Sequence, residues 1–222
     1  MSIILIIHQL CIILKIGIWS IIINKLVKWS DTLFIKVNNK NHNELKQFNQ
    51  IWIECWEEKG YELEFTINSD KFIILDDHDQ GIGTIEFIQY TPGKNTCEEV
   101  YPFNDLLEVT TNIDRIVEID KIALTKAFRG ENIDKVLYII SNYTKHNNFR
   151  YGIGLMEPIF YKAMKIFYKI PITQLSKKVF YKGDWVIPVL IDCEYTHKNP
   201  GEFKSLGKFE GPKESQLVFI ND

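Results

Sequence analysis

The pattern of apolar and polar positions predicts alternating strands and helices along most of the chain. From residue 115 to 124, apolar side chains are interleaved with two carboxylates, Glu118 and Asp120, as expected for a largely buried strand. After a short cationic turn, apolar residues recur every three or four positions from Ile133 to Tyr143, the spacing of an amphipathic helix. A helix that starts in this way offers free backbone N–H groups to a phosphate or another anion.

Similar patterns on both sides of this unit predict one α/β domain over residues 31–196. Gly60 is the expected stop of the first helix of the domain. The expected helices cover residues 43–59, 131–145 and 157–168, and the expected strands cover residues 33–37, 71–75, 83–90, 115–124, 150–155, 177–181 and 185–193. A Lys-, Gly- and Pro-containing tail is expected over residues 197–222.

Residues 1–30 form a separate, strongly apolar segment. The run from Ile3 to Ile23 has nearly the length of about 20 residues that a bilayer span needs, but Lys15 near its centre costs roughly 3 kcal/mol on insertion. The run lacks a basic start and a small-residue cleavage site, which argues against a cleaved signal peptide. Helical spacing between Ile18 and Trp29 favours a helix on the domain or on a membrane surface. A membrane anchor, an interfacial helix and an upstream extension all stay open.

Composition narrows the classes of partner and cofactor. The 222 residues carry 26 Lys and Arg against 29 Asp and Glu, a net charge of −3 that argues against a nucleic-acid partner. The five histidines have no ligand spacing, and Asp76, Asp77 and Asp79 lack the pattern of a calcium loop, so we expect no metal. We expect each of the four widely separated cysteines to be a small buried apolar side chain. These are Cys11, Cys55, Cys97 and Cys193.

The central strand, turn and helix resemble the corresponding unit of the GNAT superfamily of N-acyltransferases. Its usual signature there is Arg/Gln-x-x-Gly-x-Gly/Ala, and Arg129 and Gly130 match the frequent Arg-Gly start. Asn132 and Asp134 stand where two later small residues are expected. Because such glycines let a backbone approach a pyrophosphate closely, these two substitutions favour a donor with fewer phosphates.

Residues 151–192 resemble one branch of that superfamily, the acyl-homoserine-lactone-synthase-like and long-chain N-acyl amino acid synthases. In that branch a strand ending in Gly-x-x-x-Pro precedes a helix and a hairpin of the form Tyr-x-Gly-x-x-Val-Pro-Val-Leu-Ile-Asp, which residues 181–192 match closely. The run Glu118-Ile119-Asp120-Lys121 resembles the Glu-x-Ser-Arg of the branch, with Lys121 in place of Arg.

The resemblance covers roughly residues 33–195 and implies a GNAT-like α/β (α+β) acyl-CoA N-acyltransferase fold. This fold has a central, mixed, mostly antiparallel sheet flanked by helices, here with an extra apolar N-terminal helix. The implied activity is transfer of an acyl group from acyl-CoA or an acyl-carrier-protein thioester to a small amine such as an amino acid. No permanently bound cofactor is implied, and the location is cytoplasmic, with contact to a membrane surface through residues 3–29 left open.

Two carboxylates are the candidates for the general base of this reaction. Glu118 comes first, since burial on the central strand would raise its pKa toward the working range, and Asp120 comes second. The alternative for Glu118 is a structural salt bridge with Lys121 or Arg115. In the resembling family a loop before the central strand shapes the acceptor site, so residues 91–111 are either a lid or an inert surface loop.

Donor binding is implied for the end of the central strand and the turn after it. The Leu124 N–H would polarise the thioester carbonyl or bind the pantetheine arm, and Arg129 would hold a donor phosphate. The expected donor-binding residues are Leu124, Lys126, Arg129, Gly130, Glu131 and Asn132. Tyr168, or less favourably Tyr161, would protonate the departing thiolate, although aromatic packing is the usual role at such positions.

A carrier-protein donor suits the missing glycines, because it presents only one phosphate. Lys126, Arg129 and Lys135 would then face an acidic carrier protein. Trp52 and Trp56, in the helix over residues 43–59, are expected in the core, with contact to an acyl chain as the alternative. The first competing interpretation is a degenerate GNAT-fold protein that binds a ligand or partner without catalysis. The second is a membrane-associated structural protein organised by residues 1–30.

Overall fold

The computed structural model describes residues 33–203, in which one sheet forms the centre of the molecule. Its strands are β1 Phe34–Lys36, β2 Asp70–Leu75, β3 Gly81–Gln89, β4 Ile116–Leu124, β5 Tyr151–Met156, β6 Ile172–Gln174, β7 Val179–Tyr181 and β8 Asp184–Asp192. The helices are α2 His42–Lys59, α3 Leu107–Thr110, α4 Ile133–His146, α5 Pro158–Lys162 and α6 Cys193–Lys198. Except for β6 and α6, each strand and each long helix lies where the apolar pattern predicts it.

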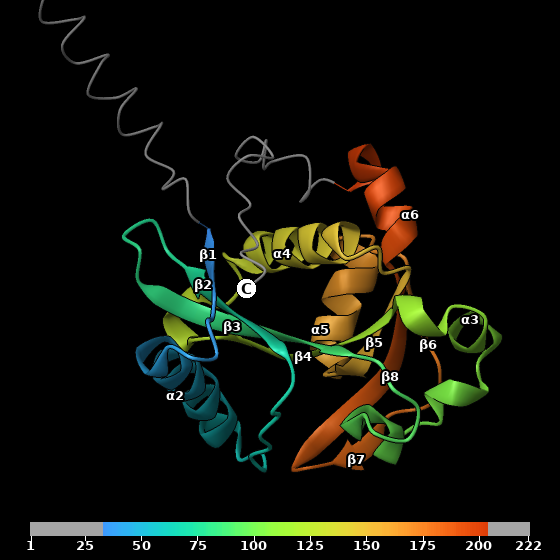
Figure 1. The fold of residues 1–222 in the computed structure, drawn as a ribbon, viewed down its shortest axis with the longest axis horizontal. Coiled ribbons are helices and arrows are strands. Elements are labelled where there is room, and N and C mark those ends of the chain that lie inside the picture. The colour runs from blue at the N-terminus through green and yellow to red at the C-terminus, as the bar shows by residue number, and fades with distance from the viewer. Residues whose placement is uncertain (1–32, 204–222) are drawn as a thin grey trace, which may run out of the picture.

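The strand order is β1-β2-β3-β4-β5-β8-β6, and β7 pairs with β8 outside this path (Figure 1). Every neighbouring pair is antiparallel except β4 and β5, which run parallel. Parallel neighbours need a crossover, and the chain between β4 and β5 supplies it as α4. The predicted fold class, a mixed and mostly antiparallel sheet flanked by helices, is therefore confirmed.

Alternating side chains of β2 show which helices cover each face of the sheet. Phe72 and Ile74 pack in the main core with α4, whereas Ile73 and Leu75 pack with α2. Since successive strand residues point to opposite faces, α2 and α4 lie on opposite sides of the sheet, as Figure 1 shows. A third apolar cluster combines residues 97–109 with β5 and β8 on the α2 side.

Helix α2 begins and ends where its sequence provides caps. The Asn41 side chain accepts hydrogen bonds from the N–H groups of Asn43 and Glu44, and Gly60 adopts a left-handed φ of 74° after the last turn. The predicted stop at Gly60 is confirmed. The apolar stripe that α2 buries against the sheet consists of Phe48, Ile51, Trp52 and Cys55.

The helix after β5 covers nearly the predicted residues but is less regular than its pattern predicts. Pro158 occupies the first turn of α5, where its missing N–H costs nothing. From Ala163 to Phe167 the chain winds as a π-helix before ending at Tyr168. A π turn adds a residue, so it rotates the side chains that follow relative to a regular α-helix.

The excursion over residues 91–111 is packed onto the sheet. It forms two short 3₁₀ turns, Thr96–Glu99 and Phe103–Asp105, followed by α3. Cys97, Phe103 and Val109 are buried in the third cluster. The segment is therefore anchored to the sheet through these three side chains, and its role as a lid stays a prediction.

The domain extends beyond the predicted boundary at residue 196. Helix α6 continues to Lys198, and Phe203 is buried in the main core, because the residues after β8 turn back over α4. Over residues 33–203, no helix has both the length and the apolar run to cross a bilayer. The expected N-terminal helix and its membrane contact fall outside the described residues.

Candidate active site

The site begins where the two parallel strands separate. β4 and β5 pair only from Ile116 to Glu118 and from Tyr151 to Ile153. Beyond these residues the gap between the strands opens into a cavity of about 320 Å³. The residues 119–124 of β4 form one wall, and the residues 153–156 of β5 form the other.

A β-bulge turns β4 away from β5 at this point. The β3–β4 register shifts between Thr84 and Glu86. At the bulge Lys121 adopts a φ of 45°, which residues other than glycine rarely take. The Thr84 hydroxyl donates a 2.9 Å hydrogen bond to the carbonyl of Lys121, which satisfies a buried acceptor that the bulge removes from the ladder. On the β5 side, a Cβ at Gly154 would lie 2.8 Å from the carbonyl oxygen of Ile119, so glycine permits the close approach before the split.

The cavity has an apolar part and a charged part. The apolar lining comes from the two strands, α4, α5 and β8, and includes Ile133, Ile140, Met156, Phe160, Met164, Val189 and Ile191. The charged lining comes from α2 and the loop after it, β4, the turn before α4, the residue before α5, and the β7–β8 hairpin. It consists of Lys59, Glu62, Glu64, Glu118, Asp120, Lys121, Arg129, Glu157, Lys182 and Asp184.

Glu118 lines this cavity as a buried carboxylate, with 3% of its surface exposed. Its oxygens accept hydrogen bonds from the Asn95 side-chain amide at 2.7 Å and from the Cys97 backbone N–H at 3.3 Å. Burial, and next the charge of Asp120, raise the pKa of Glu118 to about 7, although these two hydrogen bonds oppose the rise. A carboxylate with a pKa near neutrality inside a cavity is suited to accept a proton.

Glu118 forms neither of the salt bridges considered from sequence. Lys121 instead contacts the carboxylates of Glu86 and Asp120, and Arg115 bonds to Glu194 at 2.8 Å. The partners of Glu118 are the neutral groups of the excursion, which leaves its negative charge uncompensated by a cation in direct contact. This arrangement separates Glu118 from the structural ion pairs of the molecule.

Asp120 lies beside Glu118 at the edge of a buried ionic cluster. Its side chain is 34% exposed toward the cavity, and the Lys121 ammonium lies 3.3 Å from it. Desolvation raises the pKa of Asp120, and Lys121 opposes the rise. Behind it, Glu86 is fully buried between Lys71 and Lys121, and receives a further hydrogen bond from Ser69. This cluster holds the bulge in place and keeps Lys121 charged.

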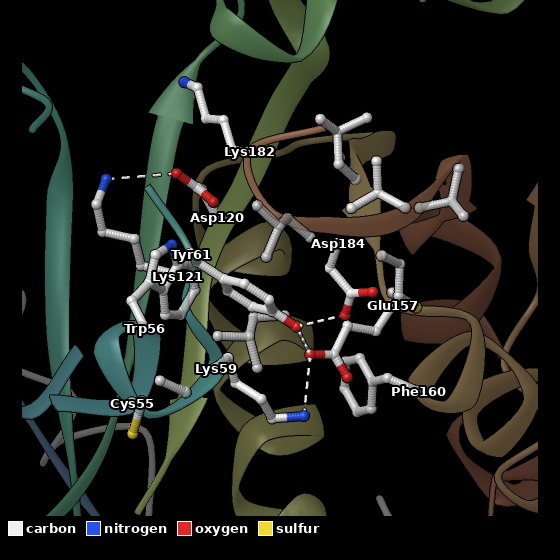
Figure 2. A pocket seen from close by; sticks show the side chains of 18 of the residues that line it. Cys55, Trp56, Lys59, Tyr61, Asp120, Lys121, Glu157, Phe160, Lys182 and Asp184 are labelled. Atoms are coloured by element: carbon white, nitrogen blue, oxygen red, sulfur yellow. Dashed lines mark hydrogen bonds and ion pairs between the residues drawn. The ribbon is translucent and has the colours of Figure 1, made fainter. Parts of the chain in front are cut away.

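Tyr61 spans one side of the cavity (Figure 2). Its hydroxyl lies between the carboxylates of Glu157 and Asp184, with 2.7 Å to Asp184, and the Lys59 ammonium lies 3.6 Å from the same Glu157 oxygen that the hydroxyl contacts. Burial, and next the hydrogen bonds to the two carboxylates, raise the pKa of Tyr61 far above its ordinary value. Tyr61 thus ties the loop after α2 to the start of α5 and to β8.

Backbone contacts strengthen this connection. The Glu62 N–H donates to the carbonyl of Lys182 at 3.1 Å, and the Lys182 ammonium pairs with Glu64. Gly183 has a φ of 102°, and a Cβ there would lie 2.7 Å from the carbonyl oxygen of Gly60. The loop after α2 and the turn of the hairpin therefore meet in close contact, and we call this contact the bridge.

The predicted donor-binding turn is present, but its arginine is already engaged. Arg129 donates to the carbonyl of Leu124 at 2.9 Å and pairs with Glu58 of α2 at 2.6 Å. Leu124, Arg129 and Gly130 line the cavity, and Gly130 has a φ of 88°. The remaining candidates, Lys126, Glu131 and Asn132, lie in the same turn outside the cavity lining.

Of the other residues singled out from sequence, all but Trp56 lie outside the cavity lining. Lys135 is buried and donates to the carbonyl of Leu75 at 2.8 Å, so the expectation that it faces a carrier protein is wrong. Tyr168 and Tyr161 are partly buried against the main core and are not among the lining residues. Trp52 is core, as expected, whereas Trp56 lines the cavity.

Sequence patterns missed several residues that define the site. Asn95, Cys97, Tyr61 and Asp184 were not candidates, because their roles depend on contacts with distant segments. Burial, and next the charge of Glu118, raise the pKa of the Cys97 thiol far above its ordinary value, so it is not a ready nucleophile. Among residues 33–203 the three cysteines are buried and free, and no cluster of His, Cys, Asp and Glu is arranged to hold a metal ion. Cys11 falls outside these residues.

By sequence, the chain matches no protein-family model and no curated protein. Solved structures do match. FeeM, an N-acyl amino acid synthase from uncultured soil microbes, superposes with a TM-score of 0.59 at 13% identity, over 72% of this chain and 90% of FeeM. The chain has a GNAT-like acyltransferase fold.

Two further structures support the same fold. BjaI, a CoA-dependent acyl-homoserine lactone synthase with SAM and isopentyl-CoA, matches with a TM-score of 0.59 at 13% identity, over 81% of this chain and 89% of BjaI. A putative N-acetyltransferase from Lactobacillus plantarum matches with a TM-score of 0.52 at 11% identity, over 73% of this chain and 99% of that protein. The resemblance to the synthase branch inferred from residues 151–192 is thus confirmed at the level of the fold.

Proposed function

We propose that this protein is an N-acyltransferase that moves an acyl group from a thioester donor, acyl-CoA or acyl carrier protein, to a small amine such as an amino acid. The observation that carries the proposal is Glu118, a buried carboxylate with a pKa of about 7 at the point where β4 and β5 separate into a cavity. The fold is one that acyl-transferring synthases use, and the cavity supplies both an apolar and a charged region.

In this reaction the amine nitrogen attacks the thioester carbonyl, a C–N bond forms and the C–S bond breaks. The attacking nitrogen must lose a proton, and the departing thiolate must gain one. Glu118, ionised above its pKa, accepts the proton of the amine directly or through a water molecule. Asp120, at the same wall of the cavity, attracts the cationic form of the acceptor toward Glu118.

The donor would enter along the turn after β4. Arg129 and Glu58 are both about one-third exposed, and because solvent weakens such exposed pairs, a phosphate can replace Glu58 as the partner of Arg129. Leu124 and Gly130 line the cavity beside it and bring backbone groups toward the pantetheine arm. The exposed Lys126 remains available to an acidic carrier protein, whereas Lys135 does not.

Thiol release tests the proposal. The full chain is incubated with acyl-CoA and acyl-carrier-protein thioesters of several chain lengths, with and without a pool of amino acids. Amine-dependent release that falls by at least about a hundredfold in Glu118→Gln supports the proposed base. Glu108 is an exposed carboxylate on α3, so Glu108→Gln is the matched control and should keep the wild-type rate.

A second candidate is a degenerate member of this fold that binds an acyl thioester or another ligand without turning it over. The pairing of Arg129 with Glu58 favours it, because the predicted phosphate ligand is occupied within the protein. Donor binding that persists in Glu118→Gln, together with no thiol release from any donor in the folded wild type, would establish this alternative.

A further inference from the structure

A stretch of positive charge without acidic residues runs from α5 to the turn of the β7–β8 hairpin. Residues 158–183, which we call the basic segment, contain six lysines and no Asp or Glu. The whole chain has 26 Lys and Arg against 29 Asp and Glu. This chain has a net negative charge, yet six of its 26 Lys and Arg residues lie in the basic segment without an acidic residue between them.

Most of these charges have no partner of opposite sign. Within the described part of the chain, only Lys182 of the six pairs with a carboxylate, that of Glu64. Lys165 donates to the carbonyl of Ile172, and the Lys178 ammonium lies 4.7 Å from the ring centre of Trp185. The five exposed lysines are Lys162, Lys165, Lys169, Lys177 and Lys178.

Large apolar side chains are exposed on the same helix. Phe160 and Met164 face the cavity, so the opposite side of α5 and of the π turn is directed outward. Ile159 is 80% exposed and Phe167 is 76% exposed, and Ile166 is also largely in solvent. Apolar side chains of this size and exposure, set among lysines, are typical of an interaction surface.

The outer face of the hairpin repeats this combination. In the β7–β8 register, Tyr181 is opposite Asp184, and both line the cavity. The neighbouring pair, Phe180 opposite Trp185, therefore points to the other face, where the two rings lie 5.7 Å apart. Phe180 is 60% exposed, and Lys178 covers the Trp185 ring.

We propose that the basic segment, with Trp185 beside it, binds the surface of an anionic membrane. The lysines are attracted to acidic lipid headgroups, and the exposed aromatic and aliphatic side chains enter the interfacial layer, where Trp is favoured. An acidic protein would satisfy the charges, but it would need a separate apolar pocket for each of the side chains that protrude from the helix and from the hairpin. The apolar residues 3–29 would not neutralise the basic segment, because they carry Lys15, Lys25 and Lys28 and no acidic residue.

This surface has a consequence for the cavity. Helix α5 and the hairpin each have one face on the cavity and the other on the proposed membrane surface. The cavity would thus lie within about one helix diameter, roughly 10 Å, of the lipid headgroups. Because the inference does not depend on acyl transfer, membrane binding is measured without any substrate.

Flotation of the full chain with lipid vesicles tests the proposal. One set of vesicles is pure phosphatidylcholine and the other contains phosphatidylcholine and phosphatidylglycerol in equal parts. The lysine variant replaces four exposed lysines by Gln: Lys162→Gln, Lys169→Gln, Lys177→Gln and Lys178→Gln. The apolar variant replaces three exposed side chains: Ile166→Ser, Phe167→Ser and Phe180→Ser. The control variant removes four exposed lysines elsewhere: Lys40→Gln, Lys46→Gln, Lys94→Gln and Lys198→Gln.

Wild type should bind the anionic vesicles at least about tenfold more tightly than the neutral ones, and the lysine variant should lose this preference while the control keeps it. The apolar variant should also lose at least about tenfold in affinity. All four proteins share residues 1–32, so differences among them report on the basic segment. The proposal is overturned if the lysine variant matches the control, or if the apolar variant binds as the wild type does. It is also overturned if the apolar variant abolishes a dimer that wild type forms without lipid.

Discussion

The side-chain amide of Asn95 donates a 2.7 Å hydrogen bond to one oxygen of Glu118, and both residues are buried. Asn95 is itself held in place by the Thr91 N–H, which donates a 2.7 Å hydrogen bond to the side-chain oxygen of Asn95. The hydrogen bond stabilises the ionised form of Glu118 against the burial that raises its pKa to about 7. Asn95 thus holds the proposed base in place and lowers the pKa that burial raises.

Replacing this donor by an acceptor should shift the working pH. Asn95→Asp keeps the shape of the side chain and the bond to Thr91, but places a second carboxyl group against Glu118. The two groups then share a proton, which raises the pKa at which the pair loses its last proton. Because the ionised base is the active form, amine-dependent thiol release should rise with pH through about 7 in wild type and at a higher pH in the variant. Asn104→Asp, exposed on the same excursion, should leave the midpoint unchanged. An unshifted profile in Asn95→Asp argues against Glu118 as the base.

Glu118 should also make stability depend on pH. Its folded-state pKa of about 7 lies above the ordinary 4.5, so between these values the folded state retains a proton that the unfolded state has lost. The wild type therefore loses stability as the pH rises through this window, whereas Glu118→Gln has no such group. The free energy of unfolding of the variant, relative to wild type, should increase by on the order of 3 kcal/mol between about pH 4 and pH 8. Denaturant titrations across this range measure it, and a difference that stays flat would contradict the raised pKa.

The bridge should open more often when its central hydroxyl is removed. Tyr61→Phe leaves the carboxylates of Glu157 and Asp184 facing each other without a shared donor, at a cost of about 1–3 kcal/mol to the local structure. Hydrogen exchange of the amides in residues 60–66 and 181–184 should accelerate. The matched control is Tyr195→Phe. In the wild type the Tyr195 hydroxyl donates to Glu202 at 2.9 Å, on the exposed side of α6. Equal exchange in the two variants would show that Tyr61 does not hold the bridge closed.

The buried ionic cluster should contribute far more to stability than an exposed pair. Lys121→Met removes one of the two ammonium groups that contact Glu86, and breaking a buried pair costs about 3–5 kcal/mol. Lys36→Met breaks the pair with Asp70, which is 28% and 35% exposed, and should cost at most about 1 kcal/mol. Chemical denaturation of both variants measures the contrast. Losses of equal size would mean that the bulge does not depend on Lys121.

The parts of the fold that sequence predicts are those determined by local patterns. The alternation in β4, the three- and four-residue spacing of apolar side chains in α4 and the stop at Gly60 each follow from residues near one another in the chain. Glu118 could be selected because it lies within the apolar run of the central strand, where burial is expected to raise its pKa. The prediction for Tyr168 relied on a regular helix, and the π turn from Ala163 to Phe167 changes the direction of the side chains after it.

The contacts that complete the site join segments far apart in the chain. Tyr61 and Asp184 are 123 positions apart, and Asn95 and Glu118 are 23 apart. No periodicity or motif links such residues, because their proximity is decided by the strand order of the sheet. Lys135 illustrates the same limit: only the position of β2 reveals that its ammonium is used by the carbonyl of Leu75.

The excursion between β3 and β4 supplies Asn95 and Cys97, whereas the donor turn with Arg129 belongs to the chain after β4. Both ends of the excursion are closed by the sheet itself, since Gln89 is paired with Val117 and the Tyr90 N–H donates to the carbonyl of Ile116. The exposed residues of such a segment can be replaced without moving the strands, provided that the buried Cys97, Phe103 and Val109 are kept. Such replacements would change the surroundings of the proposed base and leave the proposed donor turn untouched, so the two parts of the site can be engineered separately.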